Sequence, residues 1–161
     1  MIDGIAYMMS PGPLRIHQWA SGNLYIQIRQ FLRGKPCEVY AAPFDVRLNP
    51  NEADDIVLQP DIIVVCDKSK LDDKACNGAP DMVIEILSPS TERLDKLIKF
   101  RKYQEYGVRE YWIVDAANKM VHVHVLNNGI YFIKAYSEQD KINVHVLEGC
   151  VVDLSEVFFA E

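Results

Sequence analysis

The chain has 161 residues and a formal net charge of −6, with 49% hydrophobic and 25% charged residues. This composition is typical of one globular domain, so we expect a single unit over residues 1–161. No apolar run approaches the roughly 20 residues that cross a bilayer, and no signal peptide is visible, so we predict a cytoplasmic protein without membrane contact. The acidic total excludes a protein that binds nucleic acid by charge alone.

Four cysteines, Cys37, Cys66, Cys76 and Cys150, are widely scattered along the chain. They form no CxxC pair, and no histidine stands near them at the spacing of a zinc finger. Free cysteine is often a core residue, so we interpret all four as reduced and mostly buried thiols.

Helical spacing of apolar residues predicts a first helix over residues 14–35, which ends at a Gly-Lys-Pro stop signal. Three segments rich in β-branched and apolar residues follow, and we read each as a strand: 37–48, 55–67 and 80–88. A second helix is expected over 91–108. The remainder favours a strand with antiparallel hairpins over 109–149, including an Asn-Asn-Gly turn, and a short helix within 151–161.

This order of elements predicts an α+β or mixed α/β fold. The second helix is long enough for a crossover, so the strand in 80–88 and the strand EYWIVD at 110–115 are expected to lie parallel in one mixed sheet.

The strand PDMVIEILS carries a glutamate, Glu85, among apolar residues. Side chains alternate along a strand, so Glu85 points away from the core formed by its neighbours, and the alternative to a functional role is a solvated strand face. Asp61 opens the preceding strand segment. If the two strands are neighbours, both carboxylates reach one cation, with the carbonyl of Ile86 as a further ligand and Asp45 as a possible third carboxylate.

The second helix carries Asp95, Lys99 and Tyr103 at intervals of four residues, which places them on one stripe. Because the helix begins shortly after Glu85, Lys99 is expected to face the acidic site, where it would hold a water or offset phosphate charge. The alternative is a surface pair with Asp95. For Tyr103 the alternative to substrate binding is packing, and for His17, in the first helix, it is a helix surface position.

Other polar residues have simpler interpretations. Asp81 lies too far along the strand to join Glu85, so we assign it to a turn or cap. His122, His124 and His145 stand in alternating strand patterns, which favour a solvated sheet face over a zinc site.

Several motifs together resemble the Uma-type restriction endonuclease family, formerly a domain of unknown function, within the PD-(D/E)xK nuclease superfamily. They are QPDIIVV, APDMVIEILSPST, the Asp95, Lys99 and Tyr103 set, and GVREYWIVD, with SPGPLRIHQ and PFDVRL in the N-terminal half. The resemblance covers nearly the whole chain.

The resemblance implies a restriction-endonuclease-like core, a Mg²⁺ or Mn²⁺ site, and hydrolysis of DNA phosphodiester bonds. In that pattern Asp61 and Glu85 correspond to the two acidic positions. From their expected places near the acidic site, His17, Asp95 and Tyr103 are our candidates for substrate binding. The usual strand lysine is replaced by Leu87, so Lys99 is the candidate replacement. The first helix lacks the glutamate found in many related nucleases, which weakens the case for two metals.

Two hypotheses about function follow from the sequence. The first is a metal-dependent endonuclease that acts as a symmetric homodimer, with EYWIVD and the late hairpins as its interface. The second is a catalytically silent nuclease-like fold that serves as a binding or regulatory module.

Overall fold

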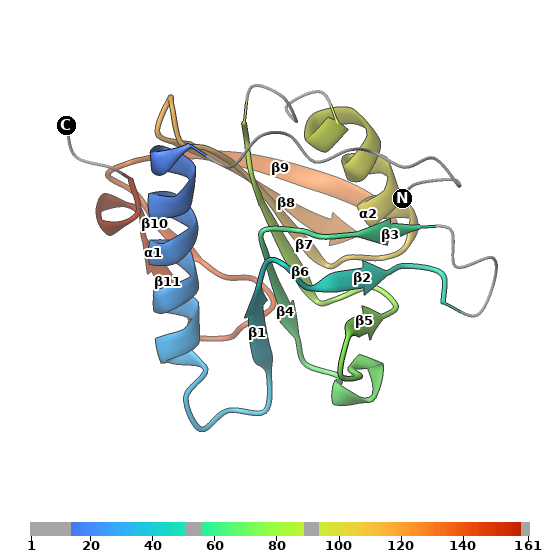
Figure 1. The fold of residues 1–161 in the computed structure, drawn as a ribbon. Coiled ribbons are helices and arrows are strands. Elements are labelled where there is room, and N and C mark those ends of the chain that lie inside the picture. The colour runs from blue at the N-terminus through green and yellow to red at the C-terminus, as the bar shows by residue number, and fades with distance from the viewer. Residues whose placement is uncertain (1–13, 51–55, 89–93, 159–161) are drawn as a thin grey trace.

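The computed structural model describes residues 14–50, 56–88 and 94–158, and of residues 94–96 only the backbone. Its centre is a six-stranded sheet in the order β1-β4-β6-β7-β8-β9 (Figure 1). Neighbouring strands are antiparallel, except that β6 and β7 run parallel as predicted. The strands are β1 (Glu38–Ala41), β4 (Ile62–Val65), β6 (Met82–Ile86), β7 (Glu110–Asp115), β8 (Met120–Asn127) and β9 (Ile130–Ser137). The mixed α/β fold expected from the sequence is confirmed.

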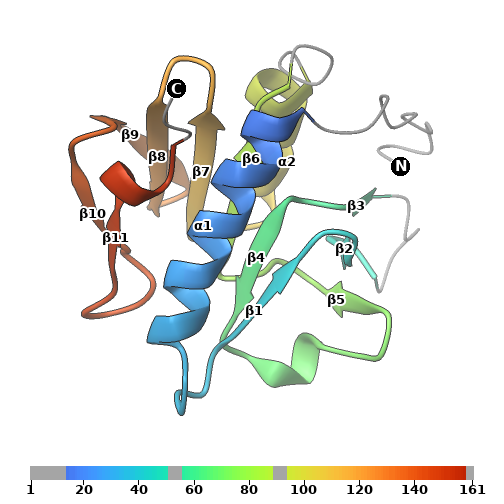
Figure 2. The same ribbon diagram turned by 60° about the vertical axis from the view of Figure 1, so that its left-hand side comes forward.

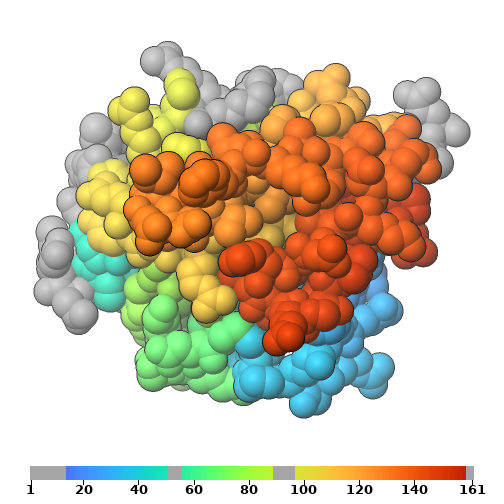
Figure 3. All heavy atoms as spheres, turned by 180° about the vertical axis from the view of Figure 1, so that it is seen from behind, coloured from blue at the N-terminus to red at the C-terminus, as the bar shows by residue number. Residues whose placement is uncertain are grey.

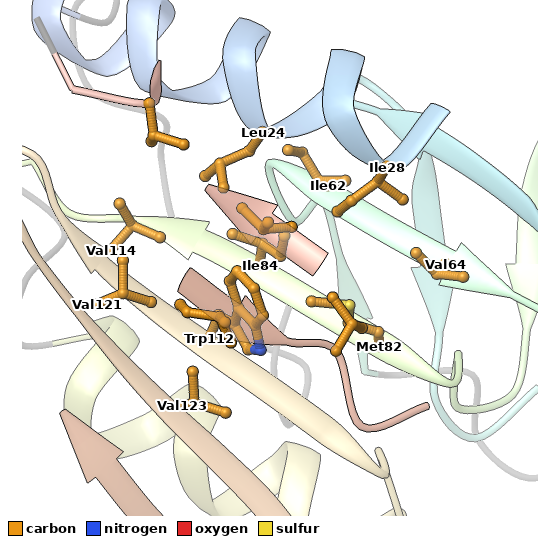
Figure 4. Close-up of a cluster of buried hydrophobic side chains, with 14 of the residues drawn as sticks. Leu24, Ile28, Ile62, Val64, Met82, Ile84, Trp112, Val114, Val121 and Val123 are labelled. Atoms are coloured by element: carbon orange, nitrogen blue, oxygen red, sulfur yellow. The ribbon is translucent and has the colours of Figure 1, made fainter. Parts of the chain in front are cut away.

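One face of the sheet is covered by the first helix, α1 (Arg15–Phe31). Ala20, Leu24 and Ile28 are completely buried, and their four-residue spacing places them on a single stripe. Figure 4 shows Leu24 and Ile28 of this stripe above the sheet core. The buried residues of the sheet in this cluster include Ile62, Val64, Met82, Ile84, Trp112, Val114, Val121 and Val123.

A small hairpin of β10 (Lys141–Asn143) and β11 (Val151–Asp153) packs beside α1 and ends in a 3₁₀ turn, Leu154–Glu156 (Figure 2). Glu110 of β7 is fully buried and anchors the connecting loop. Its two oxygens accept hydrogen bonds from the Trp112 indole at 2.8 Å and from the Val146 amide at 2.9 Å. Burial raises the pKa of Glu110. The expected antiparallel hairpins are thus present.

The opposite face of the sheet is covered by a second, three-stranded sheet and by the second helical segment. The strands are β3 (Val57–Leu58), β2 (Asp45–Arg47) and β5 (Ala75–Asn77), in that order. The helical segment is a π-helix, Leu94–Lys99, followed by α2 (Phe100–Glu105). Because both faces are covered, all five residues of β6 are buried, including Glu85. The alternative interpretation, in which Glu85 lies on a solvated strand face, is therefore wrong.

Two predicted strand segments are broken. Residues 37–48 divide into β1, in the central sheet, and β2, in the second sheet, with Pro43 between them. Residues 55–67 divide into β3 and β4 around Pro60. Proline cannot donate to a strand ladder, so each break falls where pairing stops. The structure also contains β5 and a 3₁₀ turn, Lys68–Lys70, in the stretch between the second and third predicted strand segments.

Cys37 and Cys66 form a disulfide across the ends of β1 and β4. Glu38 pairs with Val65 in the antiparallel register, so the next residues, Cys37 and Cys66, stand opposite each other. The prediction of four reduced thiols is wrong for this pair, because the spacing of cysteines does not reveal strand register. Cys76 and Cys150 are free and buried, as expected, and burial raises the pKa of each thiol to about 11.

The predicted interface strand, EYWIVD, is β7. It is hydrogen-bonded to β6 on one side and to β8 on the other, and five of its six residues are buried. It therefore cannot form a contact between subunits. The helices in the described ranges include none whose length and apolar character would suit a membrane crossing.

Candidate active site

Asp61 lies immediately before β4, at the end of the strand beside β1. Its Oδ2 accepts a hydrogen bond from the backbone amide of Ile86 at 2.7 Å, and its Oδ1 lies 3.3 Å from His17 Nε2. The Asp61 side chain is 20% exposed. Asp61 therefore joins α1 to β6 and still reaches the solvent.

The register of β4 and β6 brings Asp61 beside Glu85. Ile62 lies opposite Ile84, so the next positions along the two antiparallel chains are Asp61 and Glu85. Directly opposed residues in such a pair place their Cβ atoms about 5 Å apart. The sequence assigned a carbonyl role to Ile86, whereas the contact seen here runs through its amide, which holds Asp61.

Glu85 is 3% exposed and accepts two hydrogen bonds on the same oxygen. The Lys99 ammonium donates to Glu85 Oε1 at 2.7 Å, and the Tyr103 hydroxyl donates to it at 2.8 Å. A buried carboxylate is tolerated when it is paired and hydrogen-bonded, and Glu85 is both. Lys99, also buried, faces Glu85 as the sequence predicted.

The four-residue spacing from Lys99 into α2 explains how Lys99 and Tyr103 reach one oxygen. Lys99 is the last residue of the π-helix and Tyr103 lies four residues later in α2, so the two project from one side of the helix. The predicted stripe assumed α-helical spacing from Asp95 onward. A π-helix bonds i to i+5, so the four-residue interval no longer marks one turn before Lys99. The Asp95 side chain itself lies outside the described residues.

Tyr103 packs against a cluster of aromatic side chains. Tyr103 is completely buried against Tyr111, with ring centroids 4.9 Å apart. Tyr111 in turn stacks on His124, which also contacts Phe100 edge-on. A completely buried Tyr103 contacts Glu85 and the core, which favours the packing alternative for its ring and a positioning role for its hydroxyl.

His124 departs from the expected solvated sheet face. It is 4% exposed, and its Nδ1 lies 2.9 Å from the carbonyl oxygen of Tyr111. Burial lowers the pKa of His124. The helix α2 covers this end of β8, which alternation within the strand could not reveal. His145 is exposed, but it lies in the turn after β10 rather than on a sheet face.

A hollow of about 200 Å³ opens beside Asp61, between α1 and the end of β1. Its lining includes His17, Ser21, Tyr25 and Asp61. The His17 side chain is 12% exposed, and its contact with Asp61 places it at the acidic site. The sequence expectation that His17 reaches the substrate side is compatible with this position.

Two other acidic residues have structural partners. Asp45 lies in β2 of the second sheet, where Gln59 donates to its Oδ1 at 2.7 Å. Asp81 accepts from the Cys66 amide at 2.7 Å and pairs with Arg109 at 3.2 Å, so its predicted turn role agrees with its contacts. Across the described ranges, no three Asp, Glu, His or Cys side chains gather as a metal-binding group. Asp45 thus does not complete a three-carboxylate cluster with Asp61 and Glu85.

Comparison with known proteins shows which family this arrangement belongs to. The model of the family Uma2, described as "Putative restriction endonuclease", matches residues 1–155. The chain belongs to the Uma2 family. The resemblance seen in the sequence is confirmed, and Uma2 membership supports a nuclease-like role. Nucleases with restriction-endonuclease-like folds generally use divalent metal ions.

Two known proteins are similar to this Uma2 chain, one in sequence and one in structure. An uncharacterized protein of Synechocystis sp., slr1290, is 26% identical over 144 residues, which are 88% of this chain and 74% of that protein. The crystal structure of a "putative nuclease belonging to DUF820" from Anabaena variabilis superposes with a TM-score of 0.75 at 16% identity. That match covers 94% of this chain and 84% of the other, and it shows a shared fold.

Proposed function

We propose that this protein is a metal-dependent endonuclease that hydrolyses DNA phosphodiester bonds. The observation that carries the proposal is the buried contact between Lys99 and Glu85, beside Asp61. A buried cation held on a carboxylate next to a second, partly exposed carboxylate is a preorganised charge arrangement, and such arrangements are typical of active sites.

The donor atoms here suit a hard divalent cation. Asp61, Glu85 and the Ile86 carbonyl would supply oxygen ligands, and Mg²⁺ in proteins is commonly held by one or two carboxylates with water completing the octahedron. The absence of a third clustered side chain among the described residues agrees with that pattern rather than with a cage made only of protein ligands. Bound Mg²⁺ or Mn²⁺ would polarise the scissile phosphate and make water a better nucleophile.

Each residue of the proposed active site then has a distinct role. Glu85 and Asp61 bind the cation, and the Ile86 amide fixes the orientation of Asp61. Lys99 orients the attacking water and offsets the negative charge that develops on phosphate. Tyr103 holds Glu85 in place through its hydroxyl. His17 lines the hollow beside Asp61 and faces the substrate.

We extend the proposal to a cytoplasmic homodimer, in which two sites cut the two strands of a duplex. The outer strand of the sheet, β9, offers the contact surface, because no strand within the described ranges pairs with its outer edge and it exposes large apolar side chains. Figure 3 shows residues near 130–137 in orange at the surface of the molecule.

The decisive experiment combines cleavage with metal binding. We expect the parent to cleave plasmid or single-stranded DNA with Mg²⁺ or Mn²⁺ and to gain thermal stability from the metal. Asp61→Asn and Glu85→Ala should lose both effects. Asp45→Asn is the matched control, since Asp45 binds Gln59 in the second sheet, and it should keep both.

Three outcomes would contradict the proposal. The parent with no cleavage under either metal would favour the silent binding module. A metal-induced stabilisation that survives in Asp61→Asn and Glu85→Ala would place the metal elsewhere. Cleavage that persists in chelator would exclude metal dependence.

A further inference from the structure

A second hollow, of about 440 Å³, continues from the first along the C-terminal half of α1. Tyr25 lines both hollows, so they share a wall. The second lies between α1, the turn after it and β1, which stand side by side in both ribbon views (Figures 1 and 2). Together they form one groove, which we call the α1–β1 groove, that begins at Asp61 and His17 and ends near Arg29 and Lys35.

The half of this groove that lies away from Asp61 has more basic than acidic side chains. The second hollow is lined by Arg29, Lys35 and Lys68, against the single carboxylate of Glu38. Arg29 and Lys35 are exposed, and Lys35 Nζ lies 4.6 Å from the centre of the Phe31 ring. Lys68 pairs with Glu38 at 2.7 Å, and the Tyr40 hydroxyl also donates to Glu38. This positive end stands out on a chain whose formal net charge is −6.

We propose that the α1–β1 groove holds the phosphate backbone of the DNA strand on one side of the cleaved bond. The inference rests on the proposed function, because it takes the acidic site as the point of cleavage. Exposed cations that follow a groove away from such a site are suited to phosphates, which fix the register of the strand without reading its sequence.

The length of the groove sets which phosphates it reaches. From His17 to Arg29 the axis of α1 rises by about 18 Å, at 1.5 Å per residue. Successive phosphates of one strand of duplex DNA advance by about 3.4 Å along the axis, so Arg29 and Lys35 contact phosphates about five nucleotides from the cleaved bond.

Binding without divalent metal separates this inference from catalysis. Fluorescence anisotropy with a labelled duplex gives the Kd and its dependence on salt, and no cleavage interferes. Arg29→Ala/Lys35→Ala should weaken binding about tenfold and lower the slope of log K against log salt by up to about 1.8. Glu38→Gln should tighten binding, because it removes the carboxylate from the groove.

The matched control is Lys141→Ala. Lys141 lies on β10, pairs with Asp153 at 2.9 Å, and belongs neither to the lining of the α1–β1 groove nor to β9. It should bind DNA like the parent. Melting temperatures of all variants verify that they are folded. Equal DNA binding by the parent, Arg29→Ala/Lys35→Ala and the control would refute the proposed role of the groove. The proposed endonuclease function would still be tested separately by the cleavage assay.

A second measurement locates the contact. In this measurement a neutral methylphosphonate replaces one phosphate of the DNA strand at a time. The replacement about five nucleotides from the cleaved bond should weaken DNA binding by the parent, and it should not change DNA binding by Arg29→Ala/Lys35→Ala. A parent that does not bind DNA without metal, or that is indifferent to every neutral position, would refute the groove.

Discussion

At the scale of single residues, the pair of Glu85 and Lys99 links the stability of the fold to the proposed catalysis. Lys99 and Glu85 are 9% and 3% exposed, so each charge depends on the other in a place with little water. Removing one partner of a buried pair leaves an uncompensated charge and costs about 3–5 kcal/mol. The same charge that supports the fold is thus the one proposed to act on phosphate.

Lys99→Ala should therefore lower the rate of DNA cleavage by on the order of 10² or more and also lower the melting temperature. The increase in melting temperature on adding metal should survive, because the carboxylates remain. Lys102→Ala is the control. Lys102 contacts the exposed Glu105 at 3.8 Å, and surface pairs contribute about 0–1 kcal/mol. Parental cleavage by Lys99→Ala would contradict the assigned role.

His124 predicts how stability depends on pH. Burial lowers the pKa of folded His124 below its usual value of 6.5, so the unfolded chain takes up the proton first as pH falls. The stability that neutral His124 contributes is present above about pH 6.5 and is lost between that value and the lowered pKa.

His124→Phe keeps an aromatic ring on Tyr111 but cannot be protonated. Denaturant titrations at about pH 7.5 and pH 5.5 should show that the parent loses more unfolding free energy on acidification than this variant, by up to about 1.4 kcal/mol, the limit for acidification to one pH unit below the usual pKa. Equal losses in the two proteins would show that His124 does not carry this dependence.

The sequence predicted part of the residue-level picture. Strand alternation correctly separated Glu85 from Ile84 and Ile86, and spacing correctly turned Lys99 toward Glu85. Strand alternation could not show that the Glu85 face is also buried, because that burial comes from the packing of β2, β3, β5 and α2 over the strand, and alternation holds no information about packing partners. The use of the Ile86 amide, likewise, depends on the register of β4 and β6.

At the scale of elements, the disulfide joins the end of β1 to the end of β4 and closes a loop with a sequence separation of 29. A cross-link over such a loop stabilises the folded state by about 3–4 kcal/mol, chiefly by restricting the unfolded chain. Reductant should therefore lower the unfolding free energy of the parent by about this amount.

Cys37→Ser provides the control for that measurement. It should be less stable than the parent under oxidising conditions and insensitive to reductant. A parent whose stability is the same with and without reductant would show that the Cys37–Cys66 bond contributes nothing in solution.

Element boundaries were predictable where local chemistry sets them and not elsewhere. The turn between β8 and β9 follows from Asn128 and Gly129, which adopt the positive φ angles that such a two-residue turn requires. The transfer of β2 to a second sheet and the π-helix before Lys99 depend on packing partners. Apolar periodicity carries no record of those partners.

At the scale of the whole molecule, the two edges of the central sheet differ. β1 carries the α1–β1 groove, whereas β9 has no strand on its outer side among the described residues. Ile130, Phe132 and Ile133 of β9 are 63%, 63% and 59% exposed. An apolar, unpaired edge strand is a template for pairing with another chain.

We expect a twofold dimer through β9 at micromolar concentration, measured by light scattering. Phe132→Glu should shift the protein to the monomer, because it places a charge on the paired edge. Val151→Glu is the control, since Val151 on β11 is exposed to 49% but lies outside the sheet edge. A monomeric parent, or a dimer that tolerates Phe132→Glu, would contradict this arrangement.

The two halves of the proposed site come from different parts of the chain. Glu85, Lys99 and Tyr103 belong to the segment that runs from β6 through α2, whereas the α1–β1 groove, which includes Asp61, is built earlier in the chain. Phosphate contacts fix the position of a strand without reading its sequence. Substitutions of Arg29 and Lys35 should therefore change the affinity for all DNA sequences alike, and they should leave the contact between Lys99 and Glu85 intact.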